Sequence, residues 1–291
     1  MARLKVLPCL DSDAMAEERR GELDVPRAYA SELGRTAVEA ARAGAYRHGG
    51  RAVPWGDAVE AARAAKVSIP PDADLPVAPA PAFAETRVQV TNETTLGAAR
   101  RLADAGASPL ALNFANGVYP GGGFLDGARA QEEVLCRSSA LVETLVGDPM
   151  YAAHARRPRP DSSDWAIYSP GVPVFRTDDG ATLPRPWQLD VVTCAAPYAP
   201  AVGQPESGDL LERRIRRVLA IARAYGHASL VLGAWGCGAF HNDPVRTAND
   251  FRAALEGEFA GAFAEVVFAV VDWSRERRNL GPFRDAFAAA V

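Results

Sequence analysis

The residues best suited to chemistry in this sequence are two adjacent glutamates, Glu132 and Glu133, which follow a run of three glycines. Seven residues separate Gly121–Gly123 from Gln131, the residue before the pair. Without a Cβ, glycine lets the backbone take φ > 0 and lets another molecule approach its N–H groups. A helix is expected to begin at the acidic pair, because apolar residues follow at the spacing of one helical face: Val134, Leu141 and Leu145. The pattern indicates chemistry beside an anion site rather than packing.

A second glycine-rich stretch, Gly233–Phe240 (GAWGCGAF), follows an apolar strand predicted at 229–233 and precedes a helix predicted at 244–255. The N–H groups of a glycine loop, together with a helix N-terminus, form an anion site. The stretch has neither the lysine of a P-loop nor the Rossmann spacing with a ribose-binding acid. Two such loops in one sheet suit a diphosphate. The alternative is that the glycines only form tight turns between strand and helix.

The elements that position these loops alternate between strand and helix from about residue 82 onward. Apolar strands separated by helices predict a mostly parallel sheet covered on both faces, with ligands outside the carboxyl ends of the strands. Further strands are expected at 87–91, 110–115, 166–168, 172–176, 189–194 and 266–271. Further helices are expected at 94–105, 131–146 and 210–225, and a last helix closes the chain.

The first 82 residues have a different character. Residues 12–68 are rich in Ala, Glu and Arg and predict helices without strands, with Gly44 as a stop and Asp57 as an N-cap. Five prolines crowd residues 70–81 and predict an extended linker. We therefore expect a helical N-terminal extension and linker at 1–82 and a catalytic domain at 83–291.

Composition narrows the class of protein. The chain has 291 residues and a net charge of −4, and its arginines are scattered, so no direct nucleic-acid surface is predicted. No secretory signal, membrane span or metal-binding motif is recognisable, and no cofactor is expected. Four widely spaced cysteines indicate free thiols in a reducing cytoplasm. We expect a cytoplasmic monomer.

The two loops in this order resemble poly(ADP-ribose) glycohydrolases of the bacterial (microbial) type. GGG-x7-QEE is similar to the signature of that family, and WGCGAF resembles its diphosphate-binding loop. The resemblance covers most of the chain and implies a macrodomain-like, three-layer α/β/α fold with a mixed, mostly parallel sheet and an N-terminal helical extension. It implies a hydrolase that cleaves ribose–ribose O-glycosidic bonds of poly(ADP-ribose) and releases ADP-ribose, with poly-ADP-ribosylated proteins as partners and a place in the DNA damage response.

The resemblance also implies roles for single residues. Glu133 becomes the catalytic acid and base, and Glu132 orients ribose hydroxyls at the scissile bond. Asn116 contacts the distal ribose, although Tyr119 stands where members often have Asn and competes for that position. Phe240 packs over the distal ribose. The remaining substrate-binding residues, which hold the diphosphate or border it, are Gly121, Gly122, Gly123, Gln131, Gly236, Cys237, Gly238 and Ala239.

The chemistry of the residues agrees with this assignment. Glycoside cleavage needs a proton for the leaving oxygen and an activated water, and one carboxyl can supply both in turn. Consecutive residues do not share a helical face, so Glu132 and Glu133 are expected to have separate roles. A helix N-terminus lowers the pKa of a carboxyl, so Glu133 is expected to become a competent acid mainly in the substrate complex.

Two alternative functions and two structural questions stay open from the sequence. The protein could hydrolyse mono-ADP-ribosylated protein, or it could bind ADP-ribose without catalysis, which the unpaired acid disfavours. If the extension packs over the distal-ribose side of the cleft, the enzyme favours chain ends over internal positions. Asn92–Thr94 either approaches adenine or, as we prefer, caps a helix. His241 is expected to be a solvated loop residue, and Trp235 to pack beneath the second loop.

Overall fold

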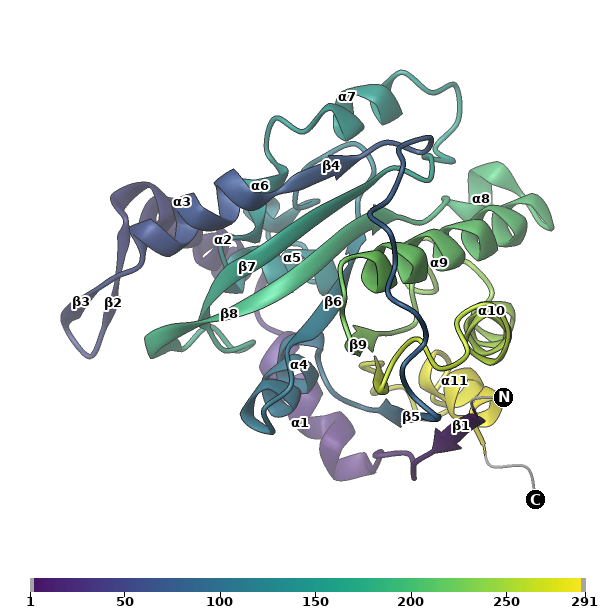
Figure 1. Cartoon of the computed structure of the whole chain (residues 1–291). Coiled ribbons are helices and arrows are strands. Elements are labelled where there is room, and N and C mark those ends of the chain that lie inside the picture. The colour runs from purple at the N-terminus through teal and green to yellow at the C-terminus, as the bar shows by residue number, and fades with distance from the viewer. Residues whose placement is uncertain (1–2, 289–291) are drawn as a thin grey trace.

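The computed structural model describes residues 3–288 and is built on one eight-stranded sheet (Figure 1). The strand order is β1-β5-β10-β9-β6-β8-β7-β4. The six strands from β1 to β8 are parallel to their neighbours, whereas β7 is antiparallel to β8 and β4 is antiparallel to β7. This confirms the predicted mixed, mostly parallel sheet. The strands are β1 (Arg3–Val6), β4 (Val67–Ile69), β5 (Glu85–Thr91), β6 (Pro109–Ala115), β7 (Ala166–Arg176), β8 (Thr182–Ala195), β9 (Ser229–Leu232) and β10 (Glu265–Ala269).

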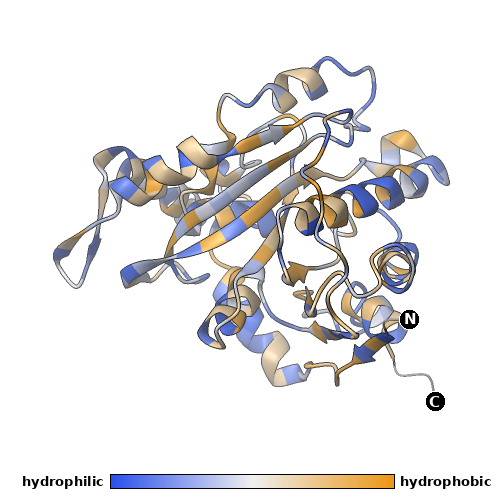
Figure 2. Cartoon of the chain, in the orientation of Figure 1, coloured by the Kyte–Doolittle hydropathy of each residue, from blue (hydrophilic) through white to orange (hydrophobic). Residues whose placement is uncertain are grey.

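Helices cover both faces of the sheet, which explains why its central strands are apolar throughout. Successive side chains of a strand point to opposite faces. Leu110 and Leu112 of β6 therefore join a core beneath one set of helices, while Ala111 joins a second core on the other face. In Figure 2, β6 and β9 are coloured mostly as hydrophobic, whereas α9 carries both hydrophilic and hydrophobic residues. The first face carries α9 (Glu206–Ala224), α10 (Pro244–Glu256) and α11 (Leu280–Ala286), and the second carries α4 (Thr95–Asp104), α5 (Gln131–Ser138) and α6 (Leu141–Leu145).

The helix predicted at 131–146 is two helices, α5 and α6, and the prediction of one continuous helix was wrong. Ser139 between them has extended backbone angles and forms a bridge with Val174 of β7. Its hydroxyl donates to Leu135 O (2.7 Å) and accepts from Leu141 N (3.1 Å). The break therefore comes from pairing with a distant strand, which helical periodicity does not report. The short strands predicted at 166–168 and 172–176 form one strand, β7, with an irregularity between Ser169 and Val172.

The N-terminal region contains the predicted helices but also strands, so the prediction of no strands in 12–68 was wrong. Helices α1 (Asp13–Leu23), α2 (Arg27–Ala43) and α3 (Gly56–Ala65) form, and Gly44 ends α2 at φ 69° as expected. Asp57 is not the N-cap of α3, because the helix already begins at Gly56. Two short strands, β2 (Ala45–His48) and β3 (Arg51–Pro54), make a hairpin whose turn, Gly49-Gly50, has positive φ at both positions.

The sheet includes strands from both sides of residue 82. Strand β1 extends the edge at β5, and β4 extends the opposite edge at β7. The proline-rich segment between β4 and β5 runs along α9, where Arg217 donates to Pro70 O and Arg223 donates to Pro79 O. The division into an extension at 1–82 and a domain at 83–291 stays a prediction, and the extension contributes to the same sheet.

Candidate active site

A cavity of about 470 Å³ lies at the carboxyl ends of three neighbouring strands, β10, β9 and β6. This is the edge at which parallel α/β sheets bind ligands. Its wall includes the end of β6, the loop after β9, the stretch after β10 and the first turn of α5. The lining residues predicted from sequence are Asn116, Gln131, Glu132, Glu133, Gly236, Gly238, Ala239 and Phe240.

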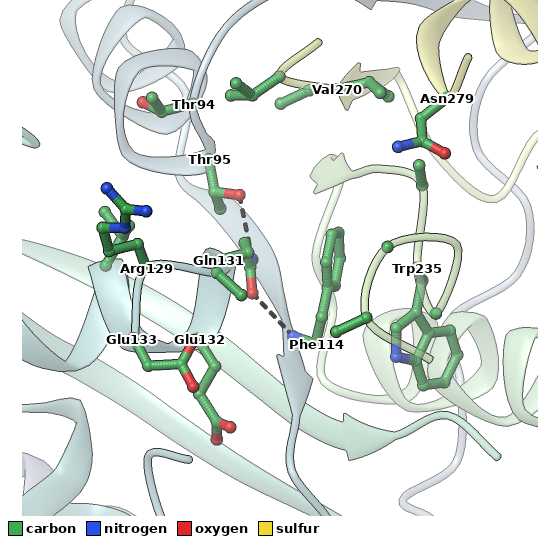
Figure 3. Close-up of a pocket in the computed structure, with 18 of the residues that line it drawn as sticks. Thr94, Thr95, Phe114, Arg129, Gln131, Glu132, Glu133, Trp235, Val270 and Asn279 are labelled. Carbon is green, nitrogen blue, oxygen red and sulfur yellow. Dashed lines mark hydrogen bonds between the residues drawn. The ribbon is translucent and has the colours of Figure 1, made fainter. Parts of the chain in front are cut away.

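Gln131 attaches the first turn of α5 to the sheet (Figure 3). Its side-chain oxygen accepts from Phe114 N (2.9 Å), and its nitrogen donates to Leu112 O (2.7 Å) and Thr95 Oγ1 (3.0 Å). The amide thus pairs with the edge of β6 much as a neighbouring strand would. Gln131 borders the cavity, but these three bonds make it a support for the two acids that follow it.

Glu132 is buried, with 2% of its surface exposed. Oε2 accepts from Asn116 N (2.6 Å), and Oε1 accepts from the Asn113 side-chain amide (3.2 Å). Burial raises the pKa of Glu132 to about 8, although these donors favour the ionised form, and the neighbouring charge of Glu133 raises it further. Near neutral pH burial therefore favours the protonated form of this carboxyl.

Glu133 differs from Glu132 in its hydrogen bonding. Its Oε1 accepts from Gly123 N (3.0 Å), whereas its buried Oε2 has no hydrogen-bond partner within residues 3–288. Both glutamates nevertheless reach the same point of the glycine loop. A Cβ added to Gly122 would overlap Oε1 of Glu133 and lie 3.1 Å from Oε2 of Glu132, and Gly122 has φ 59°.

The first glycine loop uses its N–H groups within the protein. Gly122 N donates to Tyr119 O (2.9 Å), and Gly123 N donates to Glu133. Asn116 Oδ1 accepts from Val118 N (2.8 Å) and Tyr119 N (2.9 Å), so this side chain folds the loop that precedes the glycines. Gly121–Gly123 do not line the cavity. The loop fixes the carboxylates, and its role as a diphosphate contact stays a prediction.

The second glycine loop has the properties of an anion site. Within residues 3–288 the N–H groups of four cavity residues have no acceptor: Gly236, Gly238, Ala239 and Phe240. The Asn242 amide fixes the loop by donating to Pro197 O (2.9 Å) and Gly236 O (3.2 Å). Helix α10 follows, with Asp243 as its N-cap, so the dipole of its first turn adds positive potential.

Two residues of the second loop, Trp235 and Cys237, are buried. Trp235 borders the cavity but is fully buried, as predicted. The Cys237 thiol donates to Trp235 O, and burial raises its pKa to about 12. Cys237 is therefore a neutral, tightly packed residue that does not line the cavity.

Two groups of cavity-lining residues were not predicted from the sequence. One group follows β10, and the other comes from the N-terminal region. After β10 the lining residues are Val270, Val271, Asp272, Trp273, Ser274 and Asn279. Trp273 is 44% exposed, which makes it the large aromatic surface at this end of the cavity. The position of this stretch at the carboxyl end of a parallel strand was the signal that could have found it. Thr94 also lines the cavity and caps α4, as preferred from sequence.

The N-terminal region closes the remaining side. Leu23, at the end of α1, lines the cavity beside Arg129, and Arg129 forms an ion pair with Asp24 (2.7 Å). Arg27 Nε donates to Asp126 O (2.7 Å), and the Ser31 hydroxyl donates to Leu125 O (2.5 Å). The junction of α1 and α2 is therefore bonded to the segment between the glycine loop and the acids.

The remaining candidate residues lie outside the cavity wall. His241 is exposed, as expected, and Cys136 is buried in the core. Among the described residues there is no cluster of three His, Cys, Asp or Glu side chains arranged to hold a metal ion. None of the helices in the described part of the chain is long and apolar enough to cross a bilayer.

The mixed sheet, the cavity at its carboxyl edge and the buried acid pair beside an anion loop define a macrodomain-type hydrolase site. The family model for the microbial-type poly(ADP-ribose) glycohydrolase (PARG) catalytic domain matches residues 34–177. The poly(ADP-ribose) glycohydrolase structure from Thermomonospora curvata is 43% identical, over 89% of this chain and 99% of that one, with a TM-score of 0.81. The chain belongs to the microbial-type poly(ADP-ribose) glycohydrolase family.

Two further structures are informative. The Thermomonospora curvata enzyme bound to the inhibitor ADP-HPD is 43% identical, over 88% of this chain and 98% of that one, with a TM-score of 0.81. The Deinococcus radiodurans enzyme in complex with ADP-ribose is 39% identical, over 83% of this chain and 98% of that one, with a TM-score of 0.71. Among curated proteins none matches the chain.

Proposed function

We propose that this protein hydrolyses the ribose–ribose O-glycosidic bonds of poly(ADP-ribose) and releases ADP-ribose, with Glu133 as general acid and base. The observation that carries the residue assignment is that Glu133 lines the cavity and that its buried Oε2 has no hydrogen-bond partner within residues 3–288. Both oxygens of Glu132 already accept hydrogen bonds, so Glu132 is the fixed member of the pair.

The cavity suggests how one ADP-ribose unit lies in the site. The free N–H groups of Gly236, Gly238, Ala239 and Phe240 hold the diphosphate. The adenosine lies toward the stretch after β10, with Trp273 as its aromatic surface, and the distal ribose lies between Phe240, Asn116 and the acids. Glu133 protonates the leaving oxygen and then takes a proton from the attacking water, while Glu132 orients the ribose hydroxyls. Because burial favours the protonated form of Glu132, this carboxyl presents less negative charge to an anionic substrate.

The test of the catalytic assignment is Glu133→Gln, measured with poly(ADP-ribose) and with a mono-ADP-ribosylated protein as substrates. Loss of a general acid lowers turnover by roughly 10²- to 10⁴-fold. The affinity for ADP-ribose should change little, because the shape of the side chain is kept. Turnover that persists in the variant would remove Glu133 from the mechanism, and release of ADP-ribose from the mono-modified protein alone would change the substrate class.

The closed N-terminal side of the cavity supports a preference for chain ends. Leu23 and Arg129 line the cavity, and Arg129 is paired with Asp24. We take these residues as the obstacle to a polymer that continues on this side of an internal unit. A terminal unit meets no such obstacle.

Further properties of the protein follow from the resemblance alone. The protein targets are poly-ADP-ribosylated proteins, and the reaction reverses that modification after DNA damage. The protein acts as a cytoplasmic monomer, and its four free cysteines suit a reducing compartment.

A further inference from the structure

Two exposed tyrosines and three exposed arginines gather beside the carboxylate end of the cavity. Tyr119 is 67% exposed and Tyr198 is 36% exposed. The sequence Ala155–Pro160 (ARRPRP) carries the arginines, all exposed, just after helix α7 (Pro149–Ala155). We call Tyr119, Tyr198, Arg156, Arg157 and Arg159 the rim patch. Arginine bias made this short run look like part of a scattered distribution in the sequence.

Hydrogen bonds place the segments of the rim patch together. The carbonyl of Gly117, two residues before Tyr119, bonds to His154 Nδ1 (3.0 Å) in α7. Tyr198 N donates to Pro160 O (3.0 Å), which joins the arginine loop to the start of α8 (Ala199–Val202). Figure 1 shows α7, the loop after it and α8 at one end of the molecule. These bonds fix the backbone of the patch, so its backbone needs little ordering to bind a ligand.

The rim patch is continuous with the part of the site that holds the scissile bond. The Tyr198 ring packs edge-on against Phe240, with ring centroids 5.9 Å apart, and Phe240 lines the cavity. On the other side, Asn116 accepts from Tyr119 N with its side chain and donates to Glu132 with its backbone. The portion of substrate beyond the scissile bond leaves the cavity from this carboxylate end, not from the far end at Trp273.

The chemistry of the patch matches that portion of substrate. Arg157 and Arg159 are paired with Asp161 and Glu206, whereas Arg156 has no ion pair within residues 3–288. A cation with an exposed aromatic ring is the combination that binds single-stranded polyanions, because bases stack on the ring and phosphates contact the cation. We propose that Tyr119 and Arg156 bind the next ADP-ribose unit, on the leaving side of the scissile bond. This inference rests on the proposed function.

The test is polymer binding in a Glu133→Gln background, compared with the binding of ADP-ribose, which fills the cavity alone. Loss of one base–aromatic stack predicts at least about fivefold weaker polymer binding for Tyr119→Ala, with Tyr119→Phe within about twofold. Arg156→Ala should lower the slope of log Kd against log salt by about 0.7, the value of one phosphate contact. The affinity for ADP-ribose should change less than about twofold in all three.

The matched control is Arg185→Ala. Arg185 is exposed, forms no ion pair within the described residues and lies ten residues, or about 33 Å of strand, from the active-site end of β8. Equal weakening of polymer and ADP-ribose in Tyr119→Ala would place the tyrosine in the cavity and overturn the proposal. Unchanged polymer binding in both Tyr119→Ala and Arg156→Ala would also overturn the proposal. The same would be true if Arg185→Ala lowered the salt slope as much as Arg156→Ala does. Wild-type turnover tests the proposed function separately, since polymer binding is measured whether or not cleavage occurs.

Discussion

Burial raises the pKa of Glu132, and this shift predicts how the stability of the folded protein changes with pH. An acid whose folded pKa is about 8 keeps its proton in the folded state while the unfolded chain loses it above about 4.5. The folded state then binds more protons, so the contribution of Glu132 to stability falls as pH rises from about 4.5 to about 8. The full shift corresponds to roughly 5 kcal/mol.

The prediction is that Glu132→Gln removes this decline. The free energy of unfolding of wild type and variant, measured with denaturant at several pH values, should converge toward the acid end of the window and diverge toward pH 8 in favour of the variant. Using the difference between the two proteins cancels other titrating groups, such as His154, whose pKa burial lowers to about 4. A constant difference across the window would show that Glu132 ionises normally.

Because Gly122 has no side chain, the carboxyls of Glu132 and Glu133 can pack against the glycine loop. Gly147, which has no neighbouring atoms within 4 Å of an added Cβ, is the matched control. Both have positive φ, but an added Cβ would overlap Glu133 at position 122 and meets nothing within 4 Å at position 147. Alanine at either position should lower stability by about 1–2 kcal/mol for the left-handed backbone. Only Gly122→Ala should also lower kcat, by at least about tenfold, since it displaces the Glu133 carboxyl. Equal kinetics in the two variants would contradict this role for Gly122.

The acids, the asparagine and both glycine loops were predictable because their types and spacing are local properties of the sequence. The division of labour between the loops was not. Gly122 and Gly123 look as available to a diphosphate as Gly236 and Gly238 do, and only the fold shows that Tyr119 and Glu133 already accept their N–H groups. The burial of Glu132 likewise depends on Asn113 and the sheet, which lie outside the motif.

Helix α2 fits against the 3₁₀ turn η1 (Phe124–Asp126), which directly follows the glycine loop. Gly34, in the middle of α2, faces Phe124, and an added Cβ would lie 2.6 Å from the Phe124 carbonyl oxygen. Arg176 of β7 strengthens the same junction by donating to Leu33 O (2.7 Å) and to Arg137 O of α5 (3.1 Å). The extension thus supports the catalytic segment through helix packing.

Gly34→Ala should therefore destabilise the protein by about 1–3 kcal/mol through overpacking, despite the higher helix propensity of alanine. Gly21→Ala in α1 is the matched control, because an added Cβ there meets nothing within 4 Å. It should stabilise by up to about 1 kcal/mol. Thermal unfolding measures both, and kcat should fall only in the Gly34 variant. A stabilised Gly34→Ala would mean that α2 and η1 separate freely.

Element prediction succeeded where local chemistry sets the boundary and failed where distant pairing does. Asp243-Pro244 starts α10 and Gly44 ends α2, as the sequence predicted. The break at Ser139 and the strand at Val67–Ile69 both depend on pairing with β7, more than twenty residues away. Short segments of this kind carry too few residues for a periodic signal.

At the scale of the whole molecule, the extension and the catalytic region share one sheet and one cavity wall. The composition change near residue 82 marked the linker but not the edge strands β1 and β4 on either side of the sheet. The extension therefore belongs to the architecture of the site, which supports the proposal that it restricts the enzyme to chain ends.

That proposal predicts the products of early turnover. Free ADP-ribose should accumulate from the first time points while the remaining polymer shortens gradually, because only terminal units fit past Leu23 and Arg129. Gel analysis of size-fractionated polymer measures both quantities. Early release of oligomers at a rate comparable to ADP-ribose would show that internal units enter the cavity.

Gln131 has a different role from the two glutamates that follow it, because its side chain binds to the sheet. A glutamate there would have the same shape and would suit a helix start. It would, however, turn an oxygen toward the Leu112 carbonyl that now accepts from the amide nitrogen, and two acceptors repel each other. A third acid at this position would therefore weaken the attachment of the catalytic helix to its sheet. Redesign of this scaffold for a different reaction can therefore vary Glu132 and Glu133 but has to keep Gln131.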